Sequence, residues 1–95
     1  MTREDVEIKL ECMGFEKDEV MLFEDPSYES AIIGITDDGN VCYSYKGMVE
    51  SLMGEDEMTM EDAIEFIDYN TIRSLDYFKG QTDKSWPIIV YDEFF

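Results

Sequence analysis

The chain has 95 residues, of which 24 are acidic and seven basic, so its formal net charge is −17. With 44% hydrophobic residues it is too apolar for a disordered tail, and its length predicts one domain over residues 1–95. The charge disfavours direct binding to DNA, RNA or an anionic membrane and predicts a basic protein as the partner.

Two patterns compete at residues 3–13. Thr2 and Asp5 have the spacing of a capping box, and Gly14 is suited to end a helix. Apolar residues nevertheless alternate with charged ones over 6–12, which is the period of a strand. We favour the helix.

Strand-like segments follow. EVMLFE (19–24) predicts a strand that ends before Pro26, because proline cannot donate to a β-ladder. AIIGIT (31–36) and VCYSY (41–45) flank an Asp-Gly turn, which tolerates the positive φ angles of a tight hairpin. We therefore expect an antiparallel hairpin over 31–45.

The next segments have helical spacing. Residues 46–53 predict a short helix with Gly54 as its C-terminal cap. Thr59 with Asp62 has the spacing of a second capping box, which predicts a helix over 60–69, and another short helical piece is expected over 72–78.

PIIVY (87–91) predicts the last strand. The predicted fold is thus a small α+β domain with about four strands, a central hairpin and three to four short helices.

One stretch, MGEDEMTMEDAIEFIDYN (53–70), concentrates the negative charge. On a helical wheel its apolar residues share one face, namely Met60, Ala63, Ile64 and Ile67. The opposite arc holds Glu61, Asp62, Glu65, Asp68 and Tyr69. Glu61 and Asp62 also suit the positive end of the helix dipole, so a well-solvated helix explains part of the pattern.

Metal and enzyme sites lack the necessary residues. An EF-hand needs acids at fixed positions before a glycine, and Gly39, Gly54 and Gly80 each fail that spacing. The chain has no histidine, no Walker loop and no GxGxxG. We expect no metal, no cofactor and no catalytic residue.

MTMEDAIEFIDYNTIRSLDYF (58–78) and PIIVY, with the AIIGIT hairpin, resemble segments of a family of short proteins from phages and mobile genetic elements. The resemblance covers about residues 14–91, and the family has no assigned activity. It implies a phage context, in which small acidic proteins similar in size and charge act as anti-CRISPR or other anti-defence inhibitors that imitate nucleic acid.

The leading hypothesis is a phage-type inhibitor in the cytoplasm of a bacterial host that binds a basic nucleic-acid site, such as that of a CRISPR nuclease. A domain roughly 32 Å wide would carry one net charge per 1.9 Å or so, against about 1.7 Å in duplex DNA. The predicted contact residues are Glu55, Asp56, Glu57, Glu61, Asp62, Glu65, Asp68 and Tyr69, with Asp37 and Asp38 as a second patch. The alternative is an acidic adaptor that binds a basic protein without imitating nucleic acid.

Overall fold

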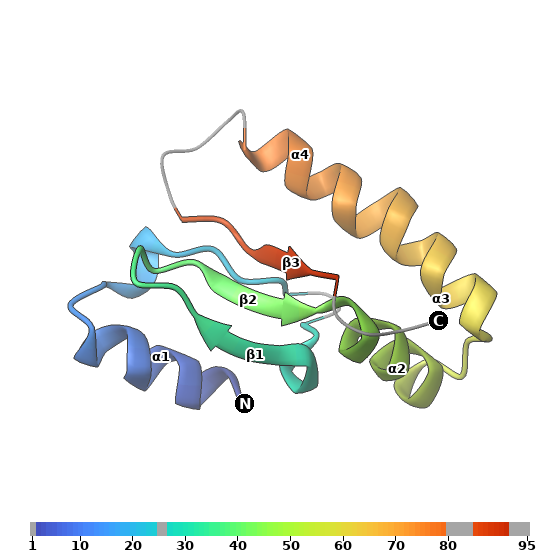
Figure 1. Cartoon of the computed structure of the whole chain (residues 1–95), viewed down its shortest axis with the longest axis horizontal. Helices are drawn as coiled ribbons and strands as arrows, with labels where there is room; N and C mark the ends of the chain where they lie inside the picture. Colours follow the sequence, from blue (N-terminus) through green and yellow to red (C-terminus); the bar gives the residue numbers. More distant parts are fainter. Residues whose placement is uncertain (1, 25–26, 80–84, 92–95) are drawn as a thin grey trace.

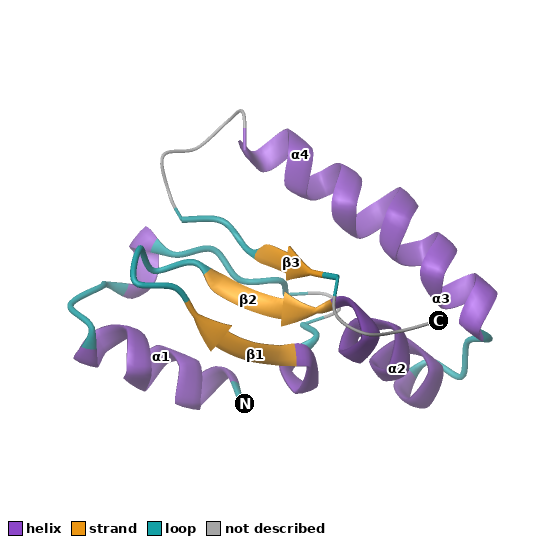
Figure 2. Cartoon of the chain, viewed as in Figure 1, coloured by secondary structure: helices purple, strands orange, loops and turns teal. Residues whose placement is uncertain are grey.

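The computed structural model describes residues 2–24, 27–79 and 85–91, which form an α+β domain (Figure 1). In this part of the chain, helices lie beside a three-stranded mixed sheet (Figure 2). In chain order the elements are α1 (Arg3–Cys12), the 3-10 turns η1 (Lys17–Glu19) and η2 (Glu29–Ala31), β1 (Ile32–Ile35), β2 (Val41–Ser44), α2 (Tyr45–Glu55), α3 (Met60–Phe66), the π-helical segment η3 (Ile67–Ile72), α4 (Arg73–Lys79) and β3 (Ile88–Val90).

β2 is the central strand of the sheet. It pairs antiparallel with β1, which confirms the predicted hairpin. In its turn, the Thr36 amide donates to the Asn40 carbonyl at 2.9 Å, and Gly39 has a φ of +88°. β3 confirms the strand expected at 87–91 and runs parallel to β2, so the chain crosses over between them through α2 and the α3–α4 helix.

α1 confirms the helix predicted near the N-terminus. The Thr2 hydroxyl accepts from the Asp5 amide at 3.1 Å, and the Asp5 carboxylate accepts from the Thr2 amide at 3.3 Å. Val6 and Leu10, one helical turn apart, are buried, whereas Ile8 is 54% exposed. The alternating pattern therefore did not decide the structure, because only one stripe of the helix is covered.

The strand predicted at 19–24 is wrong. Val20 forms a single parallel bridge with Ser85, with the Met21 amide 2.8 Å from the Ser85 carbonyl oxygen. Two residues later the Phe23 amide donates to the Tyr43 hydroxyl, so the segment has left the ladder. The Phe23 ring packs edge-on against Tyr28 and Tyr43. The described sheet accordingly has three strands.

α2 confirms the helix expected at 46–53 but extends to Glu55, so Gly54 is not its cap. The Ser44 hydroxyl begins the helix by accepting from the Gly47 amide at 2.9 Å. Gly54 keeps helical geometry, and the left-handed residue that follows the helix is Glu57, with a φ of +57°. A left-handed residue ends many helices, and glycine supplies it most often.

The two helices predicted at 60–69 and 72–78 are one continuous helix, which is a further correction. Backbone angles remain right-handed at Phe66 and Arg73, on both sides of η3. The Asn70 side chain donates to the Phe66 carbonyl at 3.3 Å, and the Thr71 hydroxyl is 2.9 Å from the Tyr28 hydroxyl in the core. The polar side chains of Asn70 and Thr71 thus make hydrogen bonds while the helix continues past them.

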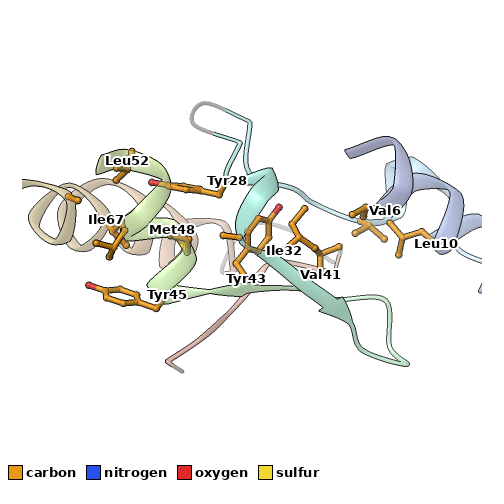
Figure 3. Close-up of a cluster of buried hydrophobic side chains, with 14 residues drawn as sticks. Val6, Leu10, Tyr28, Ile32, Val41, Tyr43, Tyr45, Met48, Leu52 and Ile67 are labelled. Atoms are coloured by element: carbon orange, nitrogen blue, oxygen red, sulfur yellow. The ribbon is translucent and has the colours of Figure 1, made fainter. Parts of the chain in front are cut away.

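Figure 3 shows the buried side chains in two adjoining groups. Val6, Leu10, Ile32, Val41 and Tyr43 fill the space between α1 and the hairpin. Tyr28, Tyr45, Met48, Leu52 and Ile67 lie between α2 and the long helix. This second group anchors the helix whose other face is acidic.

Candidate protein-binding site

The acidic stretch occupies one end of the molecule, where α2 leads into α3 (Figure 1). We define the acidic surface by the exposed carboxylates there: Glu55, Asp56, Glu57, Glu61, Asp62 and Glu65. The first three lie at the end of α2 and in the connection, and the others lie on α3. The structure thus gathers six of the predicted contact residues.

Packing on its apolar side fixes the orientation of α3. Ala63 and Ile67 are completely buried, and Ile64 is partly buried. Met60 belongs to the predicted apolar stripe but is 43% exposed, so the stripe packs only from Ala63 onward. Because one side of the helix is held by the core, its carboxylates must face solvent.

The capping box predicted at the start of α3 is only half formed. The Thr59 hydroxyl accepts from the Asp62 amide at 3.2 Å. The reciprocal bond, which Asp5 makes to Thr2 in α1, is not formed by Asp62 in the described chain. The Asp62 carboxylate therefore stays available to an external donor.

The carboxylates of α3 lack ion-pair partners among the residues that the structure describes. In the residues that the structure describes, ion pairs join Arg3 to Glu7 at 3.7 Å and to Glu24 at 3.2 Å. Within the same residues, neither Glu61 nor Glu65 has a basic group at ion-pair distance. Like charges one helical turn apart repel by a few tenths of a kcal/mol, so a cation placed between them would relieve that cost.

Asp68 has a different role from the other predicted carboxylates. The Tyr45 hydroxyl donates to Asp68 Oδ1 at 3.0 Å. Burial, together with this neighbouring carboxylate, raises the pKa of Tyr45 to about 12. Asp68 is exposed and lies in η3, and its hydrogen bond to Tyr45 joins the long helix to α2.

Tyr69 follows on the outer surface and is 59% exposed. The Arg73 guanidinium lies 5.5 Å from the centroid of its ring, a cation–π contact. On the N-terminal side of Tyr69 the surface has an open groove of about 470 Å³. Its lining consists of Met58, Asp62, Glu65, Phe66, Tyr69 and Asn70.

Three of these lining residues, Met58, Phe66 and Asn70, were absent from the predicted contact set. The spacing of 62, 65, 66, 69 and 70 corresponds to one helical stripe, which is the signal that would have identified Phe66 and Asn70. Met58 precedes α3 and has no such signal. Acidity alone selected the carboxylates and missed the apolar floor between them.

The second predicted patch is remote from the acidic surface. Asp37 and Asp38 lie in the turn between β1 and β2, at the opposite end of the long axis from the α2–α3 connection (Figure 1). Both side chains are exposed, and the Asp38 carbonyl accepts from the Ser85 hydroxyl at 3.3 Å. A contact centred on the acidic surface therefore lies at the far end of the molecule from this second patch.

Metal clusters and membrane-spanning helices are absent from the described residues. Acidic and cysteine side chains do not gather there in a group of three or more that could hold a metal ion. In the same residues, every helix is too short or too polar to cross a membrane.

No family model, curated protein or solved structure matches the chain. Its function is therefore inferred from geometry and charge.

Proposed function

We propose that this protein is a phage-type inhibitor that binds its target stoichiometrically and occupies a basic nucleic-acid site, such as the channel of a CRISPR effector. Glu61, Asp62 and Glu65 then take the place of phosphates. The observation that carries the proposal is that these carboxylates are exposed on a helix whose opposite face is fixed in the core, with no ion-pair partner among the described residues.

The charge density of the molecule supports this proposal. Its longest extent is 39 Å, so a net charge of −17 corresponds to one charge for about every 2.3 Å. This is sparser than the spacing expected for a rounder domain and remains close to the roughly 1.7 Å of duplex DNA. A basic channel that attracts a duplex would therefore also attract this protein.

Such binding has a recognisable physical signature. Opposite charges steer association and make it fast at low salt, while salt screens exposed pairs beyond a Debye length of about 8 Å at physiological ionic strength. Tight binding also needs a few buried contacts near the centre of the interface. The groove beside Tyr69 offers a place for one.

Competition with nucleic acid tests the proposal. The immobilised protein is used to capture partners from a bacterial lysate at low salt, and DNA or guide-RNA duplex is then added. A mimic releases a nucleic-acid-binding protein when the duplex is present. A partner that stays bound indicates an acidic adaptor instead, and capture that yields no nucleic-acid-binding protein contradicts the proposal.

A pair of variants locates the contact. Glu61→Lys with Glu65→Lys should abolish capture, whereas Glu11→Lys with Glu50→Lys changes the net charge equally at exposed positions of α1 and α2 and should preserve it. Asp68 is left unchanged, because its reversal would also break the Tyr45 contact.

A further inference from the structure

The groove on the N-terminal side of Tyr69 combines two kinds of wall. The carboxylates of Asp62 and Glu65 lie on exposed positions one turn apart on α3. Met58 and Phe66 contribute apolar surface and are only partly buried. A side chain that fits here must have an apolar stem and a positively charged end.

Tyr69 adds an aromatic ring to the lining of this groove. Tyr69 lines the groove together with Glu65 and Phe66, while Arg73 begins the following helix α4. The Arg73 contact shows that this ring accepts a guanidinium at 5.5 Å. Tyr69 therefore brings to the groove a ring that already contacts one guanidinium.

We infer that this groove is the site for one arginine side chain of the partner protein, an inference that rests on the proposed function and specifies its contact. The arginine stem packs on Met58 and Phe66, and its planar guanidinium lies against Tyr69 while it donates to Asp62 and Glu65. A carboxylate pair matches the fork of guanidinium N–H groups better than it matches the compact ammonium of lysine.

Nucleic-acid-binding channels supply such arginines, because they use them to hold phosphates. The half-formed cap at Thr59 leaves the Asp62 carboxylate able to accept from the guanidinium. The groove therefore supplies a specific contact within a surface whose remaining attraction is general charge.

Labelled hexa-arginine and hexa-lysine test the inference, with dissociation constants measured by fluorescence anisotropy at one fixed salt concentration. We expect hexa-arginine to bind about fivefold more tightly. Tyr69→Leu should weaken hexa-arginine binding by about three- to fivefold and hexa-lysine binding by a smaller factor. Equal affinities for the two peptides, with no response to Tyr69→Leu, would overturn the arginine site.

A charge-matched pair separates the groove from general attraction. Asp62→Asn with Glu65→Gln should weaken hexa-arginine binding by about tenfold or more. Glu4→Gln with Glu11→Gln removes the same charge from exposed positions of α1 and should weaken it by less than about threefold. Equal losses in the two pairs would contradict the inference.

NMR on the unsubstituted chain gives a readout that does not depend on any variant folding. Hexa-arginine should shift the amide signals of residues 58–70, and shifts spread over all acidic positions, including Asp37 and Asp38, would argue against a groove.

The duplex competition tests mimicry separately from the arginine site. If the Tyr69→Leu protein captures its target as tightly as before and still releases it when duplex is added, the arginine site is overturned but mimicry is not. If the groove binds arginine selectively but duplex does not release the captured target, the arginine site is supported and mimicry is contradicted.

Discussion

An added Cβ at Gly47 in α2 should destabilise the protein. A Cβ there would lie 3.0 Å from both the Cα and the Cβ of Ala31, which is 1% exposed. Gly47→Ala gains up to about 1 kcal/mol of helix propensity. Overpacking against backbone that cannot move away costs about 1–3 kcal/mol. We expect a net loss of roughly 1 kcal/mol in the free energy of unfolding.

Gly54 provides the matched control in the same helix. A Cβ there meets nothing within 4 Å, so Gly54→Ala should stabilise the protein by about 0.5–1 kcal/mol. For a domain of this size, 1 kcal/mol shifts the melting temperature by about 4–8 °C. Thermal and urea unfolding followed by circular dichroism measures both variants. If Gly47→Ala is as stable as Gly54→Ala, the close approach of α2 to η2 is not tight, and the reasoning fails.

Three other predictions concern strain, a buried hydrogen bond and alkaline pH. Glu57→Gly relieves the left-handed φ of +57° and should raise the unfolding free energy by about 1 kcal/mol in urea titrations, whereas Glu57→Ala should give no such gain. Tyr28→Phe removes the contact with Thr71 and should lower that free energy by about 1 kcal/mol; with Thr71→Val added, the loss should be smaller than the sum of the two single losses. Burial raises the pKa of both Tyr43 and Tyr45 from 10.0 to about 12, so the folded state holds these protons more tightly than the unfolded state. Stability is then fully present below pH 10 and decreases between pH 10 and 12; pH-dependent melting should show this decrease, and Tyr45→Phe should lessen it.

Elements whose signals are local were predictable. α1 and the hairpin follow from a capping box and an Asp-Gly turn, which act within a few residues. The strand prediction for EVMLFE (19–24) was wrong because a strand needs a partner along its length. In the described chain this segment forms only one bridge, between Val20 and Ser85. Thr71 in η3 bonds to Tyr28, 43 positions away, and no local pattern contains that contact.

For the acidic surface, too, local periodicity predicted some features, whereas others depend on contacts between residues distant in sequence. Helical periodicity correctly placed Glu61 and Glu65 opposite the buried Ala63. It could not reveal that Asp68 accepts from Tyr45, because that contact joins two helices. Nor could it show a groove, which depends on Met58 in the connection lying beside the α3 stripe.

The proposed binding surface and the hydrophobic core lie on opposite sides of the same helix, so the surface charges can be changed without disturbing the core packing. The carboxylates are carried by a helix whose other side packs through Ala63 and Ile67 against α2, where Met48 and Leu52 are almost fully buried. Apolar burial of about 25 cal/mol per Å² acts independently of the charges on the outer face. Charge reversal at Glu61 and Glu65 should therefore leave the fold intact, and reversing those charges also relieves self-repulsion. A loss of binding in that variant would report on the contact surface and not on unfolding.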